Sequence, residues 1–262
     1  MDDTARSSVA ETLATARLRG DTIDRFAPGV RPQTLSDAYD AQDTLHNRLV
    51  ERGHGRLAGH KIGCTTPVMQ EFLGIPSPCA GGVFDNTAHE LEGSFPFDDF
   101  LHVGVECEIA VRLAADLDQG PYDRAGVTGA VASVMAAIEV VDDRYNDYPS
   151  FDTPTLVADD FFNAGCVLGT PVVDWRALDL AAVAGRMAIN GQDVGNGVGG
   201  DIMGHPFEAL AWLATMRAER GTPLGAGEFI LLGSVVATKW VERGDVVESQ
   251  LDGLGQARAL FD

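Results

Sequence analysis

The most evident shortage in this 262-residue sequence is lysine, which occurs only as Lys61 and Lys239 although Lys and Arg together number 19. Cysteine is also scarce: the four cysteines form no CxxC pair, so neither a disulfide scaffold nor a zinc site is expected. No segment approaches the run of about 18 apolar residues that a membrane span needs, and the first 20 residues lack the regions of a signal peptide. We therefore expect a soluble, cytoplasmic protein.

Positive charge is in short supply overall. The 39 acidic residues outnumber the 19 basic ones, which gives a formal net charge of −20. Such a field repels nucleic acid and anionic membranes, so neither is expected as a partner. The apolar content of 45% is sufficient for a full hydrophobic core.

The first part of the chain has helical patterns. Apolar residues recur at helical spacing over residues 34–53, where Thr34 and Asp37 can form a capping box. An earlier helix is expected around Val9. A short helix is predicted over residues 66–74, with proline in its first turn and glycine at its end.

From residue 80 onward the chain changes to short β-rich runs separated by Gly, Pro and Asp. One further helix is predicted over residues 206–221, and the tail from residue 228 onward is predicted to form four strands with turns at "RGD" and "DGLG". These patterns predict an α+β organisation, with a helical N-terminal region over residues 1–79 and a β-rich catalytic domain over residues 80–262.

Two glutamates share one face of a strand predicted over residues 103–113. Because strand side chains alternate between faces, Glu106 and Glu108 stand side by side, opposite an apolar face. Two such carboxylates are stable as anions in open water or around a cation. The pair can therefore belong to a solvated strand face. The small Gly104 and Ala110 beside it, however, leave room for a ligand.

A third carboxylate, Glu139, ends the apolar run "AVASVMAAIEVV". Burying it is costly unless it is paired or bound to a metal, and the alternative is a partly exposed position at the end of an element. The adjoining residues 142–144 are expected to be exposed. Three carboxylates completed by water suit Mg²⁺ or Mn²⁺, and they suit Zn²⁺ poorly because no Cys or His accompanies them.

Lys61 stands in "GHKIGCTT", in a chain that otherwise uses Arg for almost every positive charge. An ammonium beside a metal-bound anionic substrate can have its pKa lowered and can exchange a proton, which a guanidinium cannot do at physiological pH. The competing interpretation is a surface salt bridge. Lys239 is expected to point to solvent.

Several blocks of the sequence, taken together, resemble the fumarylacetoacetate hydrolase superfamily. The resemblance is to the branch that holds the 2-keto-4-pentenoate hydratases and 4-oxalocrotonate decarboxylases, and it extends from about residue 36 to the end of the chain. The blocks are "GHKIGCTTPVMQEFLGI", "VECEIAV", "AAIEVVDDR", "VADDFFNAG" and "GHPFEALAWLA".

The resemblance implies a mixed, curled β-roll or barrel-like sheet with a helical N-terminal region. It also implies a homo-oligomer that can associate with a decarboxylase or hydratase of the same pathway. It assigns Glu106, Glu108 and Glu139 to a divalent metal, Mg²⁺ or Mn²⁺, Lys61 and Asp159 to catalysis, and Gly233, Ser234, Cys79 and His205 to the substrate pocket.

The activity that the resemblance implies is hydration of a 2-hydroxy-2,4-dienoate, a small anionic 2-oxo acid in its enol form, to a 4-hydroxy-2-oxo acid. The alternatives are decarboxylation of a vinylogous 2-oxo diacid, hydrolysis of a C–C bond, and a catalytically silent partner subunit. Cys79 stands where many of the hydratases carry Asp, which weakens the hydratase assignment. In the block that usually reads "ADNAS", Asp160, Phe161 and Phe162 replace the last three residues, so two bulky rings are expected beside the pocket.

Overall fold

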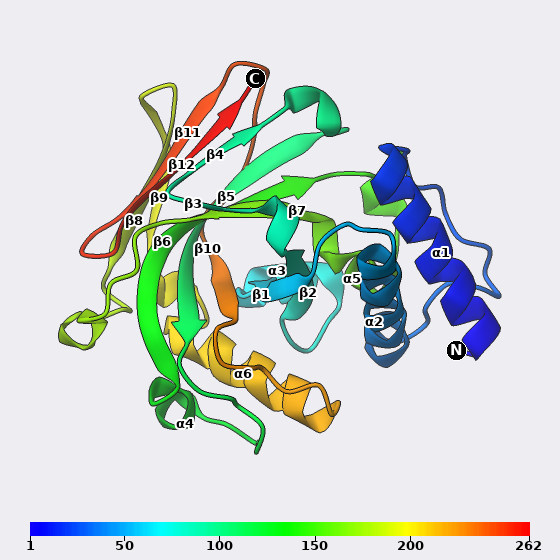
Figure 1. The fold of residues 1–262 in the computed structure, drawn as a ribbon, viewed down its shortest axis with the longest axis horizontal. Coiled ribbons are helices and arrows are strands. Elements are labelled where there is room, and N and C mark those ends of the chain that lie inside the picture. Colours follow the sequence, from blue (N-terminus) through cyan, green and yellow to red (C-terminus); the bar gives the residue numbers. More distant parts are fainter.

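The structure is a computed structural model that describes residues 1–262. The chain has six α-helices and twelve strands, and the strands form two mixed sheets (Figure 1). The strands of the larger sheet are β1 (Leu57–Gly63), β2 (Cys79–Phe84), β3 (Ala88–Glu90), β5 (Val103–Leu113), β6 (Val131–Asp142), β7 (Asn163–Leu168) and β10 (Phe229–Trp240). Those of the smaller sheet are β4 (Glu92–Phe95), β8 (Ala184–Ile189), β9 (Gln192–Val198), β11 (Val246–Leu251) and β12 (Gly255–Phe261).

The larger sheet has the strand order β2-β1-β10-β5-β6-β7-β3, and the smaller one has the order β4-β12-β11-β8-β9. Strands β1 and β10, β3 and β7, and β4 and β12 pair in parallel, while the other neighbours are antiparallel. The predicted combination of helices with mixed sheets is therefore present. No pairing joins the edge strands β2 and β3, so the larger sheet does not close into a barrel.

The helices are α1 (Asp3–Arg19), α2 (Leu35–Glu51), α3 (Pro67–Leu73), α4 (Arg124–Thr128), α5 (Thr153–Ala158) and α6 (Pro206–Glu219). Helices α1 and α2 lie side by side at the right of Figure 1, and α6 packs against β10. The predicted capping box of Thr34 and Asp37 is formed at the start of α2. Thr66 and Gly74 cap α3 as the sequence predicted.

Two details of the chain differ from the sequence prediction. Residues 57–63, which were placed in the helical region, form β1 because they pair with both β2 and β10. The tail forms three strands instead of four, because β10 runs unbroken over 12 residues and its register against β5 shifts at three points. The turns at "RGD" and "DGLG" do separate β10, β11 and β12. The division of the chain at residue 79 stays a prediction.

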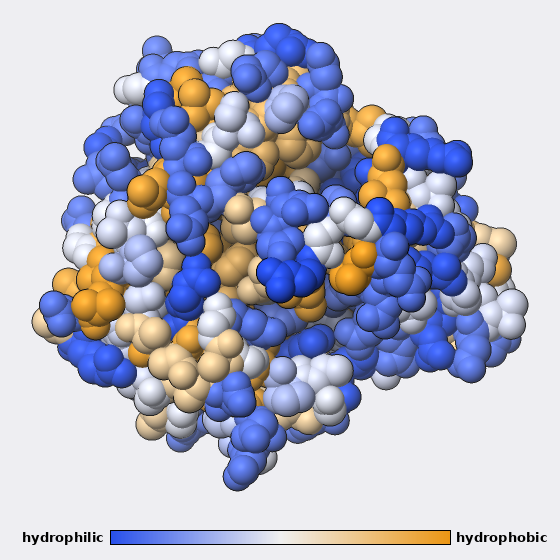
Figure 2. All heavy atoms as spheres, in the orientation of Figure 1, coloured by the Kyte–Doolittle hydropathy of each residue, from blue (hydrophilic) through white to orange (hydrophobic).

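The hydrophobic core lies around the central strands β5 and β6, in which all but a few residues are buried. The outer surface differs from this interior: hydrophilic residues cover most of the face in Figure 2, and hydrophobic residues form small separate patches. None of the helices has both the length and the apolar composition needed to cross a membrane.

Candidate active site

The three predicted glutamates meet on the two central strands. Glu106 on β5 is the register partner of Glu139 on β6, and Glu108 follows two residues further along β5. Each contributes a carboxylate oxygen to a cluster in which these atoms all lie within 4.8 Å of one another. Strand alternation and antiparallel register together produce this convergence.

These carboxylates do not form a solvated strand face. Glu108 and Glu139 are 0% exposed, and Glu106 is half-buried. Burial and the neighbouring carboxylates Glu139 and Glu106 raise the pKa of Glu108 well above its usual value. Glu108 Oε1 and Glu139 Oε2 are buried with no hydrogen-bond partner. Unpartnered, buried anionic oxygens that face one another are the arrangement expected of ligands for a hard divalent cation.

Three other carboxylate oxygens of the cluster accept hydrogen bonds from neutral donors. The Gly233 backbone N–H donates to Glu108 Oε2 at 2.6 Å, and Asn163 Nδ2 donates to Glu139 Oε1 at 3.0 Å. The Thr238 hydroxyl donates to Glu106 Oε1. Gly233 has a φ of +128°, and a Cβ there would lie 2.8 Å from the side chain of Thr65. These neutral donors fix one oxygen of each glutamate.

Lys61 on β1 points into the same cluster and is only 3% exposed. Its Nζ lies 3.1 Å from Glu139 Oε1 and donates to the Phe161 carbonyl at 3.0 Å. Burial favours the neutral amine, but the carboxylates of Glu139 and Glu106 raise the pKa of Lys61 above its usual value. The surface salt bridge considered for Lys61 is thus excluded. The lowered pKa expected for Lys61 beside a metal-bound substrate stays a prediction.

The Phe161 carbonyl belongs to a strained turn. Asp160, Phe161 and Phe162 have positive φ values of 53°, 47° and 71°, which L-residues adopt only where the surrounding structure holds them. The turn follows α5 and leads into β7. It places a main-chain oxygen on Lys61 and the Phe161 ring 5.6 Å from the same Nζ.

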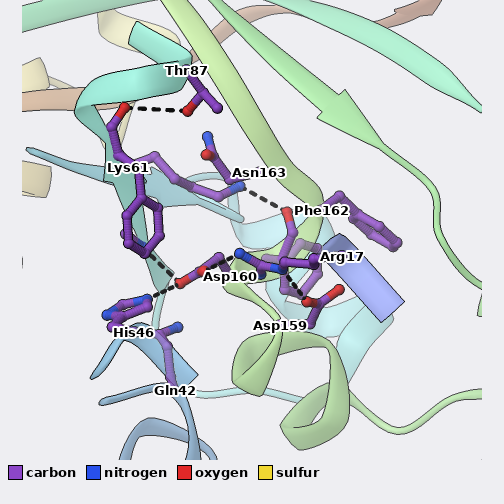
Figure 3. Close-up of polar contacts among 12 residues, drawn as sticks. Arg17, Gln42, His46, Lys61, Thr87, Asp159, Asp160, Phe162 and Asn163 are labelled. Carbon is purple, nitrogen blue, oxygen red and sulfur yellow. Dashed lines mark hydrogen bonds and ion pairs between the residues drawn. The ribbon is translucent and has the colours of Figure 1, made fainter. Parts of the chain in front are cut away.

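Buried ion pairs hold this turn (Figure 3). Arg17 on α1 bridges both aspartates, with Nε 2.7 Å from Asp159 Oδ1 and Nη1 2.8 Å from Asp160 Oδ2. Arg144 Nη2 lies 3.0 Å from Asp159 Oδ2, and His46 Nε2 lies 2.7 Å from Asp160 Oδ1. Arg144 was expected to be exposed and is 5% exposed, because it reaches back to Asp159. Asp159 therefore lies behind the turn, with its oxygens occupied by this network.

A cavity of about 520 Å³ opens onto the cluster. Lys61, Glu106 and Ser234 line it, and so do Phe161 and Phe162, as the sequence predicted for the two rings. Cys79 and His205 do not line it.

These two residues have other surroundings. Cys79 is fully buried on β2, where hydrogen bonding with the Cys64 thiol and burial raise the pKa of its own thiol. A neutral thiol thus occupies the position where the resemblance leads one to expect Asp. His205 caps α6, with its Nδ1 accepting from the Phe207 N–H at 3.0 Å.

Sequence reasoning did not identify Arg17, His46 or Asn163 as part of this site. Arg17 is 142 residues from Asp159 along the chain, and His46 is 114 residues from Asp160, so no local pattern links them. Asn163 did carry a signal, since it stands beside the two Phe residues in "DDFFNAG".

The chain is similar to known proteins in both sequence and structure. The sequence model of the fumarylacetoacetate (FAA) hydrolase C-terminal family matches residues 95–261. A 2-keto-4-pentenoate hydratase from Burkholderia vietnamiensis is 35% identical over 262 residues, which cover 99% of this chain and 98% of that protein. The chain belongs to the fumarylacetoacetate hydrolase family.

Within the fumarylacetoacetate hydrolase family, this chain is similar to hydratases and decarboxylases alike. A 4-oxalocrotonate decarboxylase from Pseudomonas putida is 32% identical, with 97% of this chain and 96% of that protein covered. The solved 4-oxalocrotonate decarboxylase from Pseudomonas putida G7, complexed with magnesium and adipate, has a TM-score of 0.93 at 29% identity and covers 100% of this chain and 99% of its own. A second structure of that enzyme holds calcium and acetate.

Proposed function

We propose that this member of the fumarylacetoacetate hydrolase family is a metal-dependent hydratase that adds water to a 2-hydroxy-2,4-dienoate and yields a 4-hydroxy-2-oxo acid. The observation that carries the proposal is the convergence of three glutamates, two with unpartnered buried oxygens, beside the Lys61 amine. Full-length similarity to a 2-keto-4-pentenoate hydratase supports this reaction.

The metal in this proposal is Mg²⁺ or Mn²⁺, held by Glu106, Glu108 and Glu139. An all-oxygen donor set suits a hard cation with open positions for water or substrate, and solved relatives hold magnesium or calcium. When bound, the ion supplies a Lewis acid that polarises the 2-oxo group of the substrate.

Lys61 is the proton carrier in this mechanism. Its ammonium is fixed by Glu139 and by the Phe161 carbonyl, which leaves its third N–H directed to a ligand. The dienol must lose the proton of its 2-hydroxyl group and gain one at the far carbon of the diene. Water then adds across the double bond that remains conjugated with the 2-oxo group. Lys61 Nζ can hold and deliver such a proton, and its charge balances the developing enolate.

Other side chains prepare the site for this chemistry. The rings of Phe161 and Phe162 line the cavity and exclude bulk water, which strengthens the electrostatic interactions within it. Asp159 contributes as a positioning residue, because it holds the turn that carries the Phe161 carbonyl. Gly233 positions Glu108, and Ser234 lines the cavity while its hydroxyl donates to the Val236 carbonyl at 2.6 Å.

Decarboxylation of a vinylogous 2-oxo diacid is the second candidate. The TM-score of 0.93 to a 4-oxalocrotonate decarboxylase favours it, and so does the neutral Cys79 thiol in place of a carboxylate. C–C bond hydrolysis and a silent subunit remain as outcomes of the same assay.

The test is the ultraviolet absorbance of a 2-hydroxy-2,4-dienoate with added Mg²⁺ or Mn²⁺. We expect absorbance to decay, chelator to abolish the decay, and Lys61→Ala to slow it by about 10²-fold or more. Lys239→Ala is the matched control, since it removes the only other lysine and does not touch the cavity. Release of CO₂ from a vinylogous 2-oxo diacid assayed in parallel would establish decarboxylation. No decay across a panel of dienoates and no CO₂ release would favour the silent subunit.

The proposal includes three broader expectations. The substrate is a small anionic 2-oxo acid or its enol. The protein acts in the cytoplasm as a homo-oligomer, and it can associate with a decarboxylase of the same pathway. Gel filtration and light scattering of the purified protein test the oligomeric state directly.

A further inference from the structure

From the lining of the cavity we infer the substrate class within the proposed function: a monocarboxylic dienoate with a bulky apolar substituent at the end remote from its carboxylate. The inference rests on the proposed function, because it takes the cluster of glutamates as the site that binds the 2-oxo acid end. A preference for a monocarboxylic substrate would distinguish this protein from enzymes that act on diacids.

The charges in the cavity admit one carboxylate. Among the 21 lining residues, Lys61 is the only cation, and it already faces Glu106 and Glu139. The remaining charged residue of the lining is Asp201, whose Oδ2 is fixed by the Val198 N–H at 2.8 Å. A second substrate carboxylate would therefore lose its water without gaining a cation, and it would add a further negative charge beside Asp201.

The remote part of the cavity is apolar. Thirteen of the 21 lining residues are hydrophobic, and they come from four separate parts of the chain. Met69 and Phe72 extend from α3, Tyr148 and Phe162 flank α5, and Trp240 ends β10. A lining assembled from several elements in this way is typical of a site for an apolar ligand group.

Several apolar side chains of the cavity lining are exposed, as expected if they contact an apolar substituent of the substrate. Phe72 is 75% exposed, Trp240 is 46% exposed and Met69 is 41% exposed, although all three line the cavity. An apolar substituent would cover part of this surface and gain about fourfold in affinity for each methylene that it buries. The volume of about 520 Å³ lies within the range of sites for drug-sized ligands, and the smallest dienoates would leave much of it unfilled.

The experiment compares two 2-oxo acids of equal chain length, 2-oxohexanoate and 2-oxoadipate, which differ only in a methyl or a carboxylate at the remote end. Binding to the full chain with Mg²⁺ is measured by titration calorimetry, so turnover is not needed. We expect 2-oxohexanoate to bind at least tenfold more tightly, and longer 2-oxo acids to bind about fourfold more tightly per added methylene.

Two arginine variants on α3 provide a matched pair. Phe72→Arg places a cation in the cavity lining, where it can pair with the remote carboxylate of 2-oxoadipate. The ratio of the Kd of 2-oxoadipate to the Kd of 2-oxohexanoate should therefore fall by tenfold or more. Val68→Arg adds the same charge at a residue that is also 75% exposed but does not line the cavity, so it should leave the preference unchanged.

The outcomes separate the two proposals. Equal or tighter binding of 2-oxoadipate to the unmodified protein overturns the inference about the apolar substituent and leaves the 2-oxo acid site standing. Binding of neither acid in the presence of Mg²⁺ overturns the proposed function itself.

Discussion

At the scale of single residues, Glu108 is costly to bury as long as nothing offsets its charge. It is completely buried beside Glu106 and Glu139, and its Oε1 has no hydrogen-bond partner. A cation bound between the three carboxylates removes this penalty and stabilises the folded state by mass action, by about 2.7 kcal/mol at a concentration 100 times the Kd. The carboxylate that suits Glu108 to bind a cation therefore lowers the stability of the metal-free protein.

Glu108→Gln should make the metal-free protein more stable and should remove the stabilisation by metal. In the presence of chelator the variant should melt about 2 °C or more above the unmodified protein, because a buried charge is gone. The rise in Tm on addition of Mn²⁺ should be lost. Thermal unfolding by circular dichroism measures both effects, and Glu51→Gln at an exposed position serves as the control. A variant that still gains Tm from Mn²⁺ would show that Glu108 is not a ligand.

His60 makes stability depend on pH. Burial, together with the nearby Arg217 and His46, lowers the pKa of His60 to about 3. An unfolded histidine titrates near 6.5, so the unfolded state takes up the proton first. The contribution of neutral His60 to the free energy of unfolding is therefore fully present above pH 6.5 and is lost as the pH falls towards 3. By pH 5 the loss is about 2 kcal/mol.

His60→Asn should remove this part of the acid sensitivity. The difference in free energy of unfolding between pH 7 and pH 5 should shrink by about 1 to 2 kcal/mol in the variant. Urea denaturation at the two pH values measures it. His102→Asn, at a side chain that is 55% exposed, should leave the difference nearly unchanged, and an equal effect of both variants would contradict the assignment to His60.

Part of the site could be predicted residue by residue. Strand alternation placed Glu106 and Glu108 together, an acidic residue in an apolar run drew attention to Glu139, and the scarcity of lysine singled out Lys61. Each of these signals is local. Arg17 and His46 gave none, because their partners are brought to them only by the folded chain.

At the scale of elements, helix α1 supports the turn at residues 160–162 through Arg17. Removing one partner from a buried ion pair leaves the other charge uncompensated, which typically costs about 3–5 kcal/mol. The three residues with positive φ would then lose their main constraint, and the Phe161 carbonyl would no longer be fixed on Lys61.

Arg17→Ala should therefore lower the free energy of unfolding by about 3 kcal/mol and reduce kcat more than it changes KM. The matched control is Arg52→Ala, which breaks an exposed ion pair between the residue that follows α2 and Glu11 of α1 and should cost far less stability than Arg17→Ala. Urea denaturation and steady-state kinetics measure the two effects. Equal losses in both variants would mean that Arg17 only holds α1 in place and does not support the turn.

The elements themselves were predictable where the signals are local. Capping residues located the starts of α2 and α3, and turn residues located the ends of β10 and β11. The role of β1 was missed, since a seven-residue strand becomes recognisable only through its pairing with β10, more than 160 residues later. Strand order in both sheets depends on such distant pairings.

At the scale of the whole molecule, the net charge of −20 acts against the compact state. Salt screens this self-repulsion, since the Debye length falls from about 30 Å at 0.01 M to about 3 Å at 1 M. We expect Tm to rise between 0.01 M and 0.5 M KCl in the presence of chelator. Thermal unfolding over this range measures the effect, and a flat profile would show that the acidic residues are too well paired or spaced to repel.

The region that matches the family model starts at residue 95, whereas the amine of Lys61 and the guanidinium of Arg17 come from the chain before it. Under the proposed function, the ligands for the cation and the carrier of the proton thus come from different parts of the sequence. A truncated protein beginning at residue 95 would keep the three glutamates but would lack both Lys61 and Arg17. A search limited to the matched region would therefore miss the proposed proton carrier and the guanidinium that holds the neighbouring turn.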